Sequence, residues 1–239
     1  MSEFINTLLF GIYPYIALAV LILGTAARYD REPYTWKSGS SQLLRRKQLI
    51  WGSVLFHVGV LVIFFGHLIG LLTPIAIFDA IGISHGAKQL LAVIAGGIAG
   101  IMAIIGATLL IHRRLFDARV RAASSATDTL IIVLLWIQLA LGLLTIPISL
   151  QHLDGHEMVK FMTWAQGIFT FNGAASSYVA DASIVFKLHL TLGLTILLLF
   201  PFTRLVHMLS VPVRYMWRPG YQVVRERNRR AAQTRVPAE

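Results

Sequence analysis

The chain has 239 residues, of which 56% are hydrophobic and 13% are charged, and its formal net charge is +10. So few charges cannot give a soluble protein of this length a solvated surface, which favours one membrane domain. The basic residues form short clusters at the ends of apolar runs, which argues against a nucleic-acid partner. The absence of cysteine excludes disulfides, cysteine-ligated iron–sulfur clusters and thiol catalysis in this chain.

Five segments are apolar enough to cross a membrane, which takes about 20 residues. They are residues 4–27, 48–72, 89–111, 129–148 and 183–207. The first lacks the basic n-region of a cleaved signal peptide, so we expect it to remain as a helix. We predict an all-α membrane protein, a five-helix transmembrane bundle over residues 1–224. We expect the basic C-terminal tail, residues 225–239, to be disordered.

The loops between these segments differ in charge. All but three of the 21 basic residues follow the first or third segment or lie from the end of the fifth, at Arg204, onward. The exceptions are Lys88, Lys160 and Lys187. By the positive-inside rule, the N-terminus lies outside and the C-terminus is cytoplasmic. The outer loop at 149–182 is too long for a simple turn, so we expect an amphipathic segment lying at the outer interface. Pro201 is a place where the fifth segment can bend.

Four histidines lie in two of these segments: His57 and His67 in the second, His189 and His207 in or at the edge of the fifth. A histidine inside a bilayer marks a functional site, and paired imidazoles on facing helices suit a six-coordinate b-type haem. The two segments run in opposite directions. Only His57 with His207, and His67 with His189, can therefore share a depth.

The spacings within the two segments are unequal. They are 10 and 18 residues, or about 15 Å and 27 Å along ideal helices. Haem tilt, helix inclination or a bend at Pro201 could absorb the difference. The alternative is that single histidines are interfacial residues or interhelical hydrogen-bond donors, and this alternative is strongest for His207. We interpret the remaining histidines as solvated: His85, His112, His152 and His156.

Seven segments of the chain, taken in order through Tyr215, resemble the gamma subunit of bacterial membrane-bound respiratory nitrate reductase, a di-haem cytochrome b. They are IYPYIA, RYD, YTWKSGSSQLL, LFHVGVLVIFFGHLIGLLTP, RRLFDARVRA, LGLLTIPISLQHLDGHEM and FPFTRLVHMLSVPVRY. The resemblance implies that His57 and His207 are the axial iron ligands of an inner haem b. It implies that His67 and His189 ligate an outer haem b.

The resemblance also implies a function in anaerobic respiration at the bacterial cytoplasmic (inner) membrane. The subunit would oxidise quinol from the membrane quinone pool near the outer face and release protons there. Electrons would pass through the outer and then the inner haem to a cytoplasmic iron–sulfur (beta) subunit. A molybdenum-containing catalytic (alpha) subunit would then reduce nitrate, which would not meet this chain. Membrane lipid would surround the helices, and the cytoplasmic basic clusters could also bind anionic lipid.

The same resemblance places Lys88, with His67 and Gly66, at a quinol pocket. The alternative for Lys88 is an interfacial lysine that reaches toward lipid headgroups. Arg204 could contact a haem propionate, or could simply reach the interface. The chain departs from the family pattern at Lys187, where the family often has arginine. It also lacks, in residues 171–175, a histidine–glycine pair found in some relatives.

Two other functions remain open at this point. The chain could be the haem b membrane anchor of another quinone-linked oxidoreductase complex, although LGLLTIP and QHLDG argue against it. It could also be a haem-free structural or transport subunit of the membrane. An optical spectrum separates the haem-free alternative from the rest, because only a cytochrome has low-spin b-type haem bands.

Overall fold

The computed structural model describes residues 2–36 and 44–210, and all regular secondary structure within these ranges is helical. The tail predicted to be disordered, residues 225–239, lies outside the described residues. Five helices are long and apolar enough to cross a membrane, which confirms the five-helix bundle. They are Glu3–Arg31, Arg46–Leu72, His85–Phe116, Ala126–Ser149 and Ile184–Phe202.

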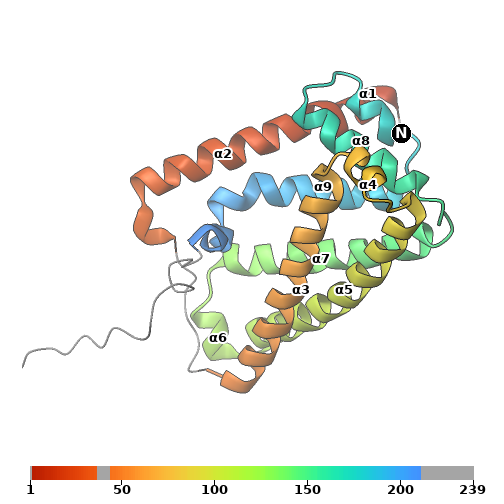
Figure 1. Cartoon of the computed structure of the whole chain (residues 1–239). Coiled ribbons are helices and arrows are strands. Elements are labelled where there is room, and N and C mark those ends of the chain that lie inside the picture. Colours follow the sequence, from red (N-terminus) through yellow and green to blue (C-terminus); the bar gives the residue numbers. More distant parts are fainter. Residues whose placement is uncertain (1, 37–43, 211–239) are drawn as a thin grey trace, which may run out of the picture.

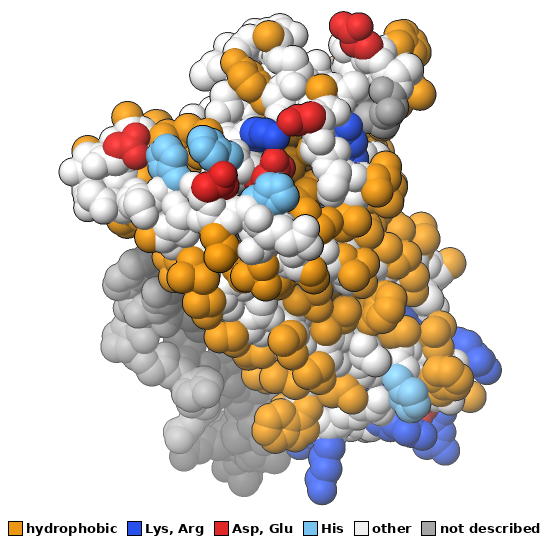
Figure 2. Space-filling view, turned by 90° about the vertical axis from the view of Figure 1, so that its right-hand side faces the viewer, with side chains coloured by type: hydrophobic (Ala, Val, Ile, Leu, Met, Phe, Trp, Pro, Cys, Tyr) orange, Lys and Arg blue, Asp and Glu red, His pale blue; other side chains and the backbone are white. Residues whose placement is uncertain are grey.

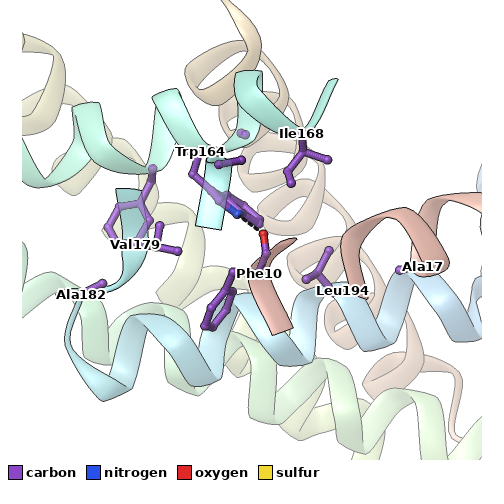
Figure 3. Packing of buried hydrophobic residues seen from close by; sticks show 10 residues of the cluster. Phe10, Ala17, Trp164, Ile168, Val179, Ala182 and Leu194 are labelled. Atoms are coloured by element: carbon purple, nitrogen blue, oxygen red, sulfur yellow. Dashed lines mark hydrogen bonds between the residues drawn. The ribbon is translucent and has the colours of Figure 1, made fainter. Parts of the chain in front are cut away.

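The first span consists of α1 (Glu3–Thr7), the π-helical turn η1 (Leu8–Ile12) and α2 (Tyr13–Arg31). The π turn ends two residues before Pro14, which has no N–H to donate to the Phe10 carbonyl four residues earlier. That carbonyl instead accepts a hydrogen bond of 2.8 Å from the indole Nε1 of Trp164 (Figure 3). After α2, a short 3₁₀ turn, η2 (Pro33–Thr35), ends the described N-terminal range.

Three long helices follow: α3 (Arg46–Leu72), α5 (His85–Phe116) and α7 (Ala126–Ser149). Serine side chains cap the N-termini of two of them, because Ser84 accepts from the amide of Ala87 and Ser125 from the amide of Asp128. These three helices run beyond the predicted apolar segments because polar residues at their ends continue the same hydrogen-bonded helix. Short helices connect them: α4 (Ile75–Ala80) and α6 (Ala118–Ala122).

The spans pack in the order α3, α5, α7, α9 (Ile184–Leu199) and α2. Among them α3 and α5 make the most extensive contact. These two helices run side by side in Figure 1. Their backbones approach closely at Gly106, where an added Cβ would lie 2.3 Å from the Phe56 nitrogen. Small residues permit this approach between membrane helices. Within the described ranges α3 makes no comparable contact with α9, although both carry histidines that face one another.

The loop between α7 and α9 contains α8 (His156–Phe169) and the 3₁₀ helix η3 (Ala175–Val179). We expected an amphipathic segment at the interface, but one face of α8 is packed inside the protein. Phe161, Trp164 and Ile168 are buried in one cluster with Phe10 of η1 and Leu194 of α9. Figure 3 shows Trp164 and Ile168 in this cluster. We call this end of the bundle the α8 end. The opposite end, with η2 and α6, is the α6 end.

The surface is divided along the same axis. On the face shown in Figure 2, hydrophobic side chains form a broad belt. Most Asp and Glu side chains on this face gather at the α8 end, whereas Lys and Arg side chains dominate the α6 end. A wide apolar belt between two charged ends is what a bilayer requires of a spanning bundle.

Candidate functional site

The structure brings the four predicted histidines together in two pairs. The ring centres of His57 and His207 lie 6.3 Å apart, with 74° between their planes. Those of His67 and His189 lie 6.2 Å apart, with 45° between their planes. Both pairs join α3 to the fifth span. The His67–His189 pair lies nearer the α8 end, and the His57–His207 pair lies nearer the α6 end.

Hydrogen bonds fix which ring nitrogen points away from the backbone in three of the four histidines. Nδ1 of His57 lies 2.7 Å from the Ser53 carbonyl, and Nδ1 of His67 lies 2.8 Å from the Ile63 carbonyl. Nδ1 of His207 contacts the Arg204 carbonyl. A carbonyl can only accept, so Nδ1 carries the proton in each ring. Nε2 is then left with a lone pair for a metal.

His189 is held differently, by the helix beside it. Its Nδ1 is buried and makes no hydrogen bond within the described chain. Its ring lies against Gly142 of α7, where an added Cβ would be 3.1 Å from the imidazole Cε1. Nε2 of Gln138, one turn earlier on α7, donates to the His189 carbonyl at 3.1 Å. Packing against α7 therefore sets the position of this ring.

The ring separations test whether a haem iron fits these sites. An iron held by two imidazoles lies about 2 Å from each ligating nitrogen, which lies about 1 Å from its ring centre, so the centres stand roughly 6 Å apart. Both observed separations match this value. Across the described residues, no three His, Cys, Asp or Glu side chains gather as a metal site. Two imidazoles without further protein ligands suit a haem better than a bare ion.

The fifth span is broken, which bears on the unequal histidine spacings. The predicted segment ran to residue 207, but α9 ends at Leu199. The chain continues as a 3₁₀ turn, η4 (Phe200–Phe202), passes through extended backbone at Thr203 and resumes as η5 (Arg204–Ser210). His207 therefore lies on η5, and an ideal helix does not measure its distance from His189.

Lys88 lies in α5 near the α8 end and is buried. Its Nζ donates to the Gly70 carbonyl at 3.1 Å, contacts Met162 Sδ at 2.9 Å and lies 3.5 Å from the ring centre of Phe78. Gly70 follows His67 by one turn of α3, so Lys88 contacts α3 close to the pair at the α8 end. Gly66, beside His67, has no atom within 4 Å of an added Cβ.

Arg204, considered above as a propionate contact, and Lys187, where the chain departs from the family pattern, both have protein partners. Nε of Arg204 lies 3.8 Å from Oδ1 of Asp128, and the other carboxylate oxygen, Oδ2, lies 3.6 Å from Nη1 of Arg114. Lys187 is buried, and its Nζ donates to the Ala180 carbonyl. Arg204 reaches the pair at the α6 end through its backbone, because its carbonyl accepts from His207.

Sequence reasoning missed Gln138, which supports His189, and Arg28, which binds the backbone at the break after α9. Gln138 has a detectable signal, since an amide within an apolar helix is costly unless it is hydrogen-bonded. Arg28 belongs to a basic cluster, which was interpreted as setting the topology and as a binding surface for anionic lipid. The carbonyls of Ser53, Ile63 and Arg204 carry no signal at all in the sequence.

Comparisons with known proteins agree over nearly the whole chain. The family model described as nitrate reductase gamma subunit matches residues 6–227. The respiratory nitrate reductase 1 gamma chain of Escherichia coli (strain K12) is 51% identical, over 95% of this chain and 100% of that protein. The respiratory nitrate reductase 2 gamma chain of the same strain is 49% identical, over 95% and 100%.

A more distant relative extends the match. The nitrate reductase gamma chain of Bacillus subtilis (strain 168) is 37% identical, over 92% of this chain and 98% of that protein. Full-length similarity at these identities, together with the family model and the five membrane spans, leads to one conclusion. The chain belongs to the nitrate reductase gamma subunit family.

Proposed function

We propose that this chain binds two b-type haems and carries electrons from quinol to the other subunits of a respiratory nitrate reductase. His57 and His207 would hold one haem, and His67 and His189 the other. The observation that carries the proposal is the pair of imidazole separations, each suited to one iron. Bound haem would supply one-electron redox chemistry at potentials set by its ligands and their surroundings.

The family makes this chain a membrane cytochrome b subunit of nitrate reductase, a complex with catalytic and other subunits. We propose that the α6 end faces the cytoplasm, where iron–sulfur (beta) and molybdenum (alpha) subunits dock. The excess of Lys and Arg at that end supports this orientation (Figure 2). The α8 end and the N-terminus would then face outward.

In this proposal the protein contributes the orientation of the ligands. Carbonyls of Ser53, Ile63 and Arg204 hold three imidazoles with Nδ1 protonated, which makes Nε2 a better ligand. Two histidine pairs at different depths let electrons cross the bilayer in short steps.

We propose that quinol binds at the α8 end, between Lys88 and the His67–His189 pair. Lys88 supports this because it is buried and donates to the carbonyl of Gly70, which lies one turn of α3 after His67. Its ammonium N–H groups could turn from Gly70 and Met162 to hydrogen-bond a quinol oxygen. Gly66 leaves room for a ring beside His67.

The test of the haem proposal uses optical spectra of the purified complex. The wild type should show two low-spin b-type haems that a quinol analogue reduces. His67→Ala and His189→Ala should each remove one and the same haem, and His57→Ala and His207→Ala should each remove the other. Absence of haem bands, or behaviour of His57 and His189 as a pair, contradicts the proposal.

The quinol pocket is tested separately with Lys88→Gln. A hydrogen bond from a charged group contributes about 1.5–3 kcal/mol, so quinol oxidation should slow by roughly 10- to 150-fold with both haems retained. Lys160→Gln is the control, because Lys160 lies at the same end but pairs with Glu157 and Asp181. A Lys88→Gln complex that oxidises quinol at the wild-type rate contradicts this assignment.

A further inference from the structure

Arg28 lies near the C-terminal end of α2, and its side chain reaches the break between α9 and η5. Nη1 donates to the carbonyls of Pro201 at 2.7 Å and Thr203 at 2.8 Å. Nε donates to Thr35 Oγ1 and Nη2 to the Thr35 carbonyl, both at 3.1 Å. One guanidinium thus joins the break in the fifth span to η2, which follows α2.

These bonds satisfy backbone groups that the helix break leaves free. The last carbonyls of a helix have no partner within the helix, and extended backbone at Thr203 ends the helical bonding. Within a membrane span such groups are costly to leave unpaired. The planar fork of arginine places donors on three nitrogens, and here Nη1 binds the break while Nε and Nη2 bind Thr35. The single ammonium of lysine cannot reproduce that geometry.

A second residue of α2, Gly24, also contacts the break after α9. Gly24 lies one turn before Arg28, and an added Cβ there would lie 2.9 Å from Pro201 Cγ and 3.1 Å from Pro201 Cβ. The Pro201 ring therefore packs directly on the α2 backbone. Leu205 and Val206 are buried beyond the break, packed with Phe200 and Trp36. The start of η5 is held from both sides.

We propose that Arg28, with Gly24, is the positioning element for His207, and through it for the haem at the α6 end. This inference rests on the proposed haem function. Thr203, which Arg28 binds, precedes His207 by four residues, and the Arg204 carbonyl between them orients the His207 ring. Arg28 thus fixes where η5 begins and how His207 faces His57.

Two other roles for Arg28 fit the contacts less well. A guanidinium has five N–H groups, and the four hydrogen bonds to protein oxygens leave little capacity to bind a haem propionate. A purely topological role requires positive charge at this end but no specific geometry. Arg31, on the same helix three residues later, makes no hydrogen bond or ion pair within the described ranges and serves as the matched control.

The experiment uses the intact complex with Arg28→Gln, Arg28→Lys, Gly24→Ala and Arg31→Gln. Each variant is also combined with His189→Ala, so that only the haem at the α6 end remains. In a second series it is combined with His57→Ala, so that only the haem at the α8 end remains. Haem loss to an acceptor such as apomyoglobin and the redox midpoint of each haem are measured. Changes behind metal ligands typically weaken metal sites about 10- to 100-fold.

We expect Arg28→Gln, Arg28→Lys and Gly24→Ala to speed loss of the α6-end haem about tenfold or more and to shift its midpoint. The other haem and the Arg31→Gln complex should match the wild type. If Arg28→Lys loses haem at the wild-type rate with a wild-type midpoint, Arg28 acts only through its charge and the inference is overturned. Equal loss of both haems in the Arg28 and Gly24 variants would also overturn it. A failure of the proposed function gives a different result. In that case the wild-type complex itself would lack two haems that depend on these histidines.

Discussion

Gly106→Ala tests the contact between α3 and α5. The new Cβ would lie 2.3 Å from the Phe56 nitrogen, 2.7 Å from the Gly52 oxygen and 2.8 Å from the Phe56 Cα. All three atoms are backbone, so no side chain can move away. The nearest contact must lengthen by about 1 Å to reach the ordinary limit of 3.4 Å, which requires the helices to separate.

Overpacking costs about 1–3 kcal/mol, and backbone contacts place this change at the upper end. For a chain of this size, about 3 kcal/mol lowers the thermal midpoint by roughly 6–12 °C. Because Phe56 precedes His57, the haem at the α6 end should also be lost more readily than the other. Far-ultraviolet circular dichroism in detergent and haem spectra measure these effects.

The control for this prediction is Gly96→Ala in the same helix. An added Cβ at Gly96 meets no atom within 4 Å, and alanine is preferred to glycine within a helix by roughly 0.5–1 kcal/mol. Gly96→Ala should therefore keep or slightly raise the thermal midpoint. If Gly106→Ala and Gly96→Ala unfold at the same temperature, α3 and α5 do not approach as described.

Two further predictions concern single hydrogen-bonding groups. Trp164→Phe keeps an aromatic ring but leaves the buried Phe10 carbonyl without its indole donor, so the free energy of unfolding should fall by about 1–3 kcal/mol. Trp136→Phe removes an indole hydrogen bond at a more exposed site and should lower the free energy of unfolding less. Equal losses in the two variants would contradict the prediction. Hydrogen bonds from the amide of Val120, and then from Arg45, hold the pKa of Asp117 below its usual value. The charged carboxylate therefore stabilises the protein above the unfolded pKa of about 4, and this stabilisation is lost as the pH falls through the lower folded pKa. Asp117→Asn still caps α6 but should flatten this acid dependence in thermal midpoints measured from neutral to acidic pH, and an unchanged slope would contradict it.

The five spans and the depth order of the histidines could be predicted because both depend on local information. Hydropathy identifies each span, and the direction of the chain then decides which histidines can meet. The helix break could only be suspected, because Pro201 removes a hydrogen bond without specifying the direction of the chain after it. Gly24 and Arg28 decide that direction from α2, far away in the sequence.

The packing of α8 was missed for a different reason. An amphipathic pattern shows that a helix has one apolar face, but it does not show whether lipid or protein covers that face. Trp164 and Ile168 are buried because the π turn and Pro14 in the first span shape a surface that receives them. The contacts of Lys88 with Gly70 and Met162 likewise depend on three segments meeting at the α8 end.

The order in which the spans pack has a consequence for biogenesis. Because α3 reaches the rest of the bundle mainly through α5 and α8, the spans form two sub-bundles, α3 with α5 and α7 with α9 and α2. These sub-bundles are joined along α5 and α7 and through α8. Insertion of all five helices can therefore be completed before either cofactor arrives. In our proposal each haem then ties one sub-bundle to the other through its two histidines. Chains without haem would then lack these two ties and would be cleaved more readily by a protease between the sub-bundles.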